Sequence, residues 1–406
     1  MRGYQGLLAV VGVLLAGAAQ AGIVFTPHLS EYAILPPGPY VEGTFIATEI
    51  EHIYDRNGDK VELGTPFVEP GDSTDAALFL FKYLWVGNIF RDSKVPLLRD
   101  RAQFCRMIGV LGYQQNTGRI AARTRLFGHR PGSNGFGDLF GLCGIYGREH
   151  QWGPLKFNGL LATTVKFPVG RYDTDAALNI GTNYWSTIPQ FAFHAELFGR
   201  LYVDGTLAYQ INGDNDEPSF GGLTPTRIAN WRNAEINFAW KFSEHWFADI
   251  GFSHRSSAGS NAYDQVTVNF KDQPVAPQSA CDNTNNGLGI EVLTPELCNS
   301  PALSQVFVSP LPGPYRDRGI EGNMVTAGLY YIYRASTVLQ ARMAQPVSGQ
   351  GSQFDAEFYV CAVQPCNETT SGGVTTTSTL FGVQEAAAVS ASPYFELRLV
   401  HLWWAP

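Results

Sequence analysis

The chain has 406 residues and a formal net charge of −8; 45% of its residues are hydrophobic, 13% aromatic and only 16% charged. The acidic balance argues against a nucleic-acid partner, which would require a basic surface. Beyond the amino-terminal segment no run of 18 uninterrupted apolar residues occurs, which argues against a membrane-spanning helix.

The first 21 residues have the features of a secretory signal peptide. Arg2 precedes an apolar run from Leu7 to Leu15, and Ala19-Gln20-Ala21 supplies an A-x-A cleavage site. We therefore expect residues 1–21 to be removed on export and residues 22–406 to form a single domain. The segment from Gly22 to Pro39 is rich in proline and has no sustained periodicity. It predicts an irregular lead-in on the periplasmic side.

Twelve segments downstream have the composition or alternation of β-strands, which predicts an all-β chain. In order they are Tyr40–Tyr54, Ala76–Trp85, Gln103–Tyr113, Leu139–Tyr146, Asn158–Phe167, Pro189–Leu197, Leu201–Asn212, Arg232–Phe242, Trp246–Arg255, Asn323–Arg334, Thr337–Gln345 and Tyr394–Trp404. The second of them is apolar on both parities, so periodicity alone does not separate a strand from a short buried helix there.

The clearest pattern lies between Pro189 and Asn212. Apolar residues occupy alternate positions before the tight turn at Phe198-Gly199-Arg200, and the alternation resumes after it. This predicts a β-hairpin, with strands about as long as the ~9–11 tilted residues that cross a bilayer. An apolar outer face and a polar inner face are what a transmembrane barrel needs, but a soluble amphipathic hairpin explains this one stretch equally well.

The lengths of the connections distinguish these two architectures. Short connections follow strands 6, 8 and 10, whereas long ones follow the odd-numbered strands, including loops at about 256–322 and 346–393. Outer-membrane barrels alternate in this way because one end faces the periplasm and the other the exterior. The sequence therefore predicts a transmembrane antiparallel β-barrel of about 12 strands with periplasmic N- and C-termini.

Aromatic pairs at expected strand ends predict girdles at the membrane interfaces. These pairs are Tyr184/Trp185, Phe242/Trp246 and Trp403/Trp404.

Six cysteines in an exported chain suggest disulfides. Cys281/Cys298 and Cys361/Cys366 lie in loop-like sequence, where disulfides would staple long surface loops. Cys105 and Cys143 fall on neighbouring predicted strands, where they either pair or serve as small buried residues. Zinc is the alternative, but no histidine cluster accompanies the cysteines, so we expect no metal.

Four motifs recur in a familiar order in the middle of the chain. They are Gly135–Leu139, Phe167–Asp173, Asn179–Trp185 and Tyr209–Asp216, preceded by Leu35–Tyr40 and the turn Asp55–Gly58. Their order and spacing resemble the family of outer-membrane transporters associated with phenol degradation, the MetA-pathway or SphA-like family. The resemblance implies a barrel that passes aromatic or hydrophobic compounds, without catalytic residues or cofactors. The chain departs from the family pattern in the long connection with Cys281 and Cys298 and in a threonine-rich stretch from Thr369 to Thr379.

The inward parity of the expected strands carries polar residues of both charge signs, which are our candidates for lining the lumen. They are Gln190, His194, Glu196, Asp204, Glu235, Lys241, Asp249, Arg255, Arg334, Arg342, Glu396 and Arg398. In a barrel of twelve strands they either keep a path wet or form a solid polar plug. His194 beside Glu196 also has the residue types of a general-base dyad, but no G-x-S-x-G motif accompanies it. The acidic turn from Asn212 to Glu217 lacks the full spacing of a calcium loop, so a solvated turn is the expectation.

These patterns predict a non-enzymatic channel in the outer membrane of a Gram-negative cell, with membrane lipid and a small hydrophobic or aromatic solute as its partners. Uptake would be passive diffusion through a partly polar lumen. Two alternatives are a structural or adhesive surface barrel with a plugged lumen and a barrel hydrolase.

Overall fold

The computed structural model describes residues 32–54, 58–62, 73–88, 101–118, 130–219, 225–259, 261–263, 320–334, 337–350, 352–361, 377–387 and 389–402, with isolated residues between them. The expected signal peptide, residues 1–21, lies outside the described residues.

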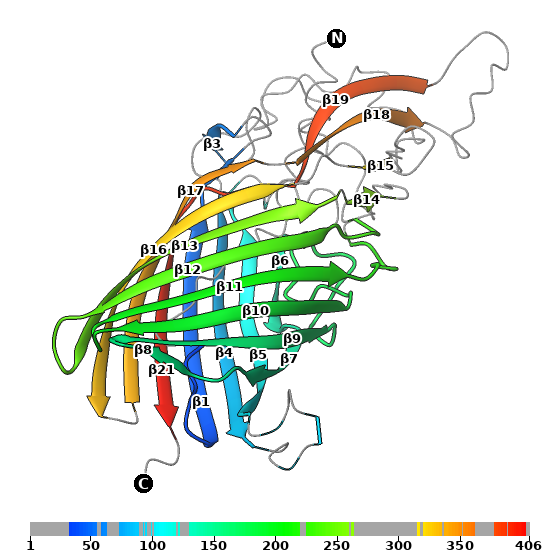
Figure 1. The fold of residues 1–406 in the computed structure, drawn as a ribbon. Helices are drawn as coiled ribbons and strands as arrows, with labels where there is room; N and C mark the ends of the chain where they lie inside the picture. The colour runs from blue at the N-terminus through cyan, green and yellow to red at the C-terminus, as the bar shows by residue number, and fades with distance from the viewer. Residues whose placement is uncertain are drawn as a thin grey trace, which may run out of the picture.

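Within the described residues, twelve strands form a closed antiparallel β-barrel (Figure 1). They are β1 (Gly38–Ile50), β4 (Thr74–Gly87), β5 (Gln103–Asn116), β7 (Leu139–Tyr146), β9 (Leu155–Phe167), β10 (Ser186–Leu197), β11 (Leu201–Asn212), β12 (Asn230–Lys241), β13 (Trp246–Ala258), β16 (Glu321–Arg334), β17 (Thr337–Gln350) and β21 (Tyr394–Leu402). Neighbours in this order pair with one another, and β1 pairs with β21 to close the sheet. The predicted twelve-stranded barrel is confirmed, and the ambiguous segment Ala76–Trp85 is a strand.

Shorter strands lie along the barrel wall and at its ends. They are β2 (His52–Tyr54), β3 (Lys60–Glu62), β6 (Gly132–Phe136), β8 (His150–Trp152), β14 (Ala262–Tyr263), β15 (Tyr315–Arg316), β18 (Ser352–Cys361), β19 (Thr377–Ala387) and β20 (Val389–Ser390). The first strand expected from the sequence, Tyr40–Tyr54, is divided at Glu51, because β2 leaves the barrel to pair with β3 and β20. The hairpin of β18 and β19 extends beyond one end of the barrel, opposite the end where β21 finishes (Figure 1).

Side chains alternate between the two faces of the wall, as the period of two requires. On the β10–β11 hairpin, Phe191 and Leu207 are 44% and 61% exposed and point outward, whereas Ala192 and Asp204 are 0% exposed and point inward. A cation on the lipid face of a barrel costs about 2–4 kcal/mol at mid-membrane, so charged residues are confined to the inner parity there. No helix among the described residues is long and apolar enough to cross a membrane.

The aromatic pairs expected at the membrane interfaces are only partly on the outer surface. Trp185, Phe242 and Trp246 are exposed, but Tyr184 is buried under the ammonium group of Lys166, whose Nζ lies 3.4 Å from the ring centroid. Tyr184 therefore does not belong to a girdle, because a cation–π contact inside the barrel holds its ring. Trp403 and Trp404 lie outside the described residues.

Candidate functional site

A segment before the first strand crosses the interior of the barrel. We call residues 32–37 the lumen segment. The backbone N–H of Tyr32 donates to Asp204 Oδ1 at 3.3 Å, and Asn158 Nδ2 donates to the Tyr32 carbonyl at 2.9 Å. Asp204 belongs to β11, which is six strands from β1 in either direction around the barrel. The chain reaches it only through the interior, so this part of the expected lead-in, which is irregular as predicted, lies inside the barrel.

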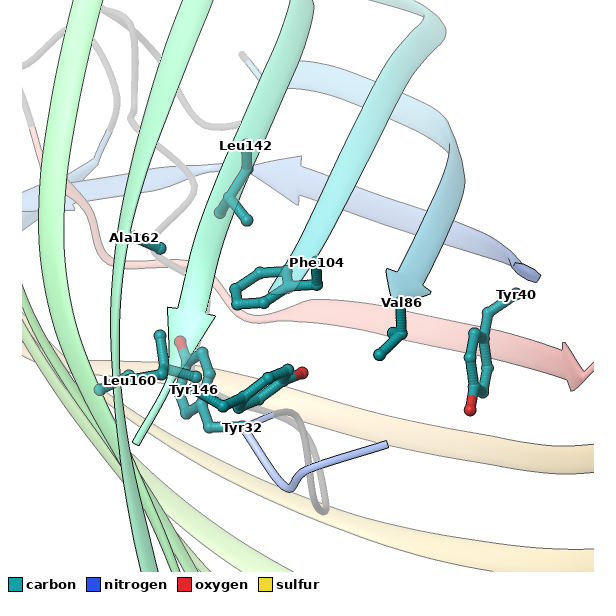
Figure 2. Close-up of a cluster of buried hydrophobic side chains, with 9 residues drawn as sticks. Tyr32, Tyr40, Val86, Phe104, Leu142, Tyr146, Leu160 and Ala162 are labelled. Atoms are coloured by element: carbon teal, nitrogen blue, oxygen red, sulfur yellow. The ribbon is translucent and has the colours of Figure 1, made fainter. Parts of the chain in front are cut away.

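The lumen segment packs on one apolar part of the inner wall, which we call the apolar sector. It consists of Tyr40, Val86, Phe104, Leu142, Tyr146, Leu160, Ala162 and Ala192 from six consecutive strands. Tyr32 is buried in this cluster (Figure 2). Ile34 and Leu35 pack against it. Burying each large apolar side chain contributes roughly 1.5–3 kcal/mol, so hydrophobic contact holds the segment in place.

The inner wall outside the apolar sector carries a belt of paired charges, which we call the ionic belt. Glu42 lies 2.5 Å from Lys82 Nζ and 2.6 Å from Arg398 Nη2. Further round the barrel, Arg342 Nε lies 3.3 Å from Asp249 Oδ2. These five side chains are at most 10% exposed. Buried charges persist only when they are paired, so the belt fixes one arrangement of the strands β13, β17, β21, β1 and β4.

The pairing of Arg342 with Asp249 depends on a glycine in the strand between them. Gly328 of β16 lies opposite both residues in the sheet register. A Cβ on Gly328 would lie 2.5 Å from Asp249 Oδ1, so any larger residue would separate the pair. Tyr330 donates to Asp249 Oδ2 at 2.7 Å, and Arg342 Nη2 donates to Thr326 Oγ1 at 2.8 Å. Nothing in the sequence indicates this arrangement beyond the inward parity of its members.

His194 does not pair with Glu196, which the sequence placed beside it as a possible dyad. Its Nδ1 lies 2.9 Å from Asp204 Oδ1, and both side chains are buried. Glu196 instead lies 3.3 Å from Lys156 Nζ. The same Asp204 oxygen accepts from the backbone of the lumen segment, so the imidazole and carboxylate together anchor that segment.

The remaining predicted inward residues lie at different depths in the wall. His194, Asp204, Asp249, Arg342 and Glu396 are buried, as is the side chain of Arg398, whereas Gln190, Glu196, Glu235, Lys241 and Arg255 are partly exposed. The guanidinium of Arg255 stacks over Trp231 at 3.9 Å, and Lys241 Nζ lies 5.7 Å from the Phe247 ring. The side chain of Arg334 lies outside the described residues. Sequence reasoning missed Glu42, Lys82 and Asn158; the single lysine inside the apolar run of β4 was the one available signal.

The four sequence motifs meet where the loops at residues 168–185 and 213–217 approach the barrel. Asp138 connects these loops to the barrel. Its carboxylate accepts hydrogen bonds from the backbone N–H groups of Gly170 at 3.1 Å and of Thr182 at 3.0 Å. The same carboxylate lies 3.8 Å from Lys166 Nζ. Asp138 is 3% exposed, so these bonds are shielded from water and fix the loop.

Glycines make this loop packing possible. A Cβ on Gly170 would lie 2.6 Å from the carbonyl carbon of Gly137, and a Cβ on Gly181 would lie 2.7 Å from that of Gly170. Both contacts are with backbone atoms, which have no room to yield. The motif glycines therefore permit three backbone segments to touch.

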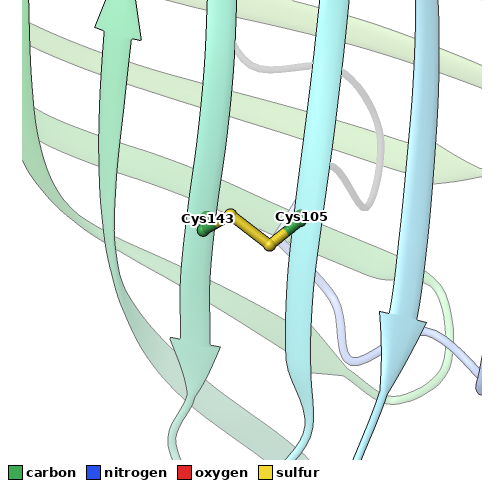
Figure 3. Close-up of a disulfide and its surroundings, with 2 residues drawn as sticks. All are labelled: Cys105 and Cys143. Carbon is green, nitrogen blue, oxygen red and sulfur yellow. A yellow bond between two sulfur atoms is a disulfide. The ribbon is translucent and has the colours of Figure 1, made fainter. Parts of the chain in front are cut away.

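One disulfide, between Cys105 of β5 and Cys143 of β7, joins neighbouring strands (Figure 3). It lies on the outer face of the wall, since Cys105 follows the inward Phe104 and Cys143 is exposed. Cys281, Cys298 and Cys366, together with the Cys361 side chain, lie outside the described residues, so their pairing stays a prediction. Among the described residues no cluster of ligands suited to a metal ion occurs, and Asp214 of the acidic turn pairs with Arg227 at 3.4 Å.

Comparison with solved structures places the barrel among outer-membrane proteins. The COG4313 outer membrane channel from Pseudomonas putida F1 has a TM-score of 0.56 at 15% identity, covering 92% of this chain and 98% of that chain. An active-site mutant of outer membrane phospholipase A from Escherichia coli has a TM-score of 0.35 at 7% identity, covering 96% and 97%. A mutant of the TodX monoaromatic hydrocarbon channel has a TM-score of 0.35 at 10% identity, covering 92% and 91%. The last two resemblances are too remote to support an argument.

Comparison with protein families gives a more specific result. No protein with a curated description matches this chain. The family model described as "Putative MetA-pathway of phenol degradation" matches residues 64–273, which is more than half of the chain and includes the four motifs. This chain therefore belongs to the MetA-pathway family of phenol degradation, as the motifs indicated, and it has the fold of an outer-membrane β-barrel.

Proposed function

We propose that this protein is a channel in the outer membrane of a Gram-negative cell for passive uptake of small hydrophobic solutes, including phenol-like aromatic compounds. The apolar sector is the observation that carries the proposal. A barrel that conducts only water-soluble solutes has a polar interior. Here an apolar surface spans six strands from Tyr40 to Ala192, and the ionic belt begins beside it on β1 and β4 and continues through β21, β17 and β13.

In this proposal a solute enters at the end bearing the long loops and diffuses along the apolar sector down its concentration gradient. The lumen segment covers that sector, so passage requires the segment to leave it. The partly exposed residues among those predicted to face inward, such as Gln190, Glu235 and Lys241, keep the remainder of the lumen hydrated. Residues 22–406 act as one domain, with the signal peptide directing export.

The proposal assigns no catalysis to the barrel. His194 and Asp204 form the hydrogen-bonded pair that a hydrolase would need, but Asp204 is also bonded to the backbone of the lumen segment. Such a pair also needs a nucleophile within hydrogen-bond reach of the histidine, and among the described residues His194 contacts Asp204 and the Tyr202 ring. The family assignment supports the same view.

Uptake into cells separates this function from a plugged adhesive barrel. A Gram-negative host that produces the protein should accumulate labelled toluene and phenol faster than a host without it, whereas a labelled sugar should enter equally in both. Equal rates for toluene in the two hosts would end the transport proposal and favour the plugged barrel.

A pair of variants on one strand tests the route. Leu160→Asn places an unpaired polar group beneath the lumen segment, which costs about 1–3 kcal/mol in the covered state only. The segment should therefore leave the sector more often, and toluene uptake should rise about 5- to 150-fold. Thr164→Asn, on the same inward face of β9 but outside the sector, should leave uptake unchanged. Equal uptake by both variants, with both barrels folded, would contradict passage along the apolar sector.

A further inference from the structure

The outer wall carries a groove of about 930 Å³ that no feature of the proposed channel uses. Three consecutive residues from each of five neighbouring strands line it. They are residues 103–105 of β5, 143–145 of β7, 161–163 of β9, 189–191 of β10 and 207–209 of β11. The sheet register places the central residues of these triplets side by side, so the groove runs across the strands.

The two rims of the groove differ in height. The rim nearer the short turns consists of large side chains, among them Leu161, Phe191 and Leu207, which are 55%, 44% and 61% exposed. The other rim consists of short groups: the Cys105–Cys143 disulfide, Thr163 and Pro189. Large side chains therefore raise one edge of the groove, while the disulfide, Thr163 and Pro189 keep the other edge low. Figure 3 shows the disulfide between its two strands.

An interruption of the sheet marks one end of the groove. The β10–β11 ladder passes from the pair Thr187–Ile211 directly to the pair Gln190–Ala208. Pro189 lies in this gap, and proline has no backbone N–H to donate to a neighbouring strand. Tyr209, on the facing strand, closes the lining at this end.

The dimensions and chemistry of the groove suit one extended hydrocarbon chain. Five strands at about 4.8 Å spacing give a length of roughly 19 Å, and rims two residues apart are separated by about 6.7 Å. None of the fifteen lining residues carries a charge. The groove is continuous with the exposed apolar surface of the wall, which is the surface in contact with the bilayer. The membrane is therefore the source of hydrocarbon chains that the groove faces.

We propose that this groove is a binding site for one acyl chain of a bilayer lipid. The site is separate from the lumen and does not depend on the proposed uptake function. The large rim supplies the contact area, and the low rim of Cys105, Cys143, Thr163 and Pro189 admits the chain. A lipid bound there would cover the interruption between β10 and β11 on the membrane side.

Native mass spectrometry of the full-length mature protein tests the proposal. The protein is reconstituted in vesicles of phosphatidylethanolamine, extracted in mild detergent and analysed for retained lipid. We expect one lipid mass on the wild-type barrel. Thr163→Trp fills the low rim and should reduce the lipid-bound fraction about tenfold or more, because an indole occupies the space of the chain. Ala327→Trp, on the exposed face of β16 at the far side of the barrel, should retain the lipid.

Leu207→Ala provides a second variant should the tryptophan disturb folding. It lowers the large rim without filling the groove, and we expect it to decrease lipid retention about tenfold by removing apolar contact. Heat-modifiable migration on gels reports whether each barrel is folded. The proposal is overturned if the wild-type barrel retains no lipid, or if folded Thr163→Trp and Leu207→Ala variants retain as much as wild type. A wild-type dimer that Thr163→Trp converts to monomer would assign the groove to a second copy of the chain instead.

Discussion

Replacing Asp204 by alanine should release the lumen segment and increase passage through the barrel. The carboxylate accepts the backbone N–H of Tyr32 at 3.3 Å and is 0% exposed. Its removal leaves a buried donor without this acceptor, which costs about 1–3 kcal/mol in the inserted state. The released state, in which water solvates that donor, does not bear this cost.

The size of the effect follows from this difference in free energy. A change of 1–3 kcal/mol shifts a two-state equilibrium about 5- to 150-fold. The apolar contacts of Tyr32, Ile34 and Leu35 remain, and each is worth roughly 1.5–3 kcal/mol when fully buried. Their sum exceeds the loss from Asp204→Ala, so the segment stays inserted in most molecules while the small released population grows.

The assay is ion conductance in planar bilayers together with toluene uptake in cells. Both should rise by the same factor, because both sample the released population. Asp214→Ala is the matched control, since Asp214 is 58% exposed and pairs with an exposed arginine at 3.4 Å. A folded Asp204→Ala barrel with wild-type conductance and uptake would show that this bond does not hold the segment, and the anchoring role would have to be abandoned.

Three further predictions concern the stability of the barrel wall, measured as the free energy of unfolding in urea. The double variant Cys105→Ser/Cys143→Ser removes a cross-link between residues 38 apart in sequence. The loop-entropy relation predicts that this loss lowers the free energy of unfolding by about 4 kcal/mol. A decrease of less than about 0.5 kcal/mol would contradict that account. Glu42→Gln leaves two buried cations without their shared carboxylate and should lower the free energy of unfolding by about 3–5 kcal/mol. An unchanged unfolding midpoint would show that these ion pairs do not stabilise the wall. Gly170→Ala places a Cβ 2.6 Å from backbone and should destabilise the loop packing, whereas Gly109→Ala, with nothing within 4 Å, should not; equal midpoints would refute the steric argument.

Local periodicity was sufficient to predict the barrel wall. Strand positions follow from the period of two, because side chains on opposite faces of one strand meet different solvents. The pattern around Phe191 and Leu207 therefore placed the β10–β11 hairpin to within a few residues, and the number of such segments predicted twelve strands. The motif glycines were likewise visible in the sequence, although their backbone contacts were not.

The contents of the barrel were decided by tertiary structure. Tyr32 and Asp204 are 172 residues apart, and Glu42 and Arg398 are 356 apart, yet each pair is in contact. Such contacts exist only after the sheet closes, since closure brings β1 beside β21 and sets β11 across the interior from β1. Alternation tells which side chains point inward but not which of them meet, because partners depend on register and strand order around the ring. For the same reason the pairing of His194 with Asp204, and not with Glu196, could be known only from the folded chain.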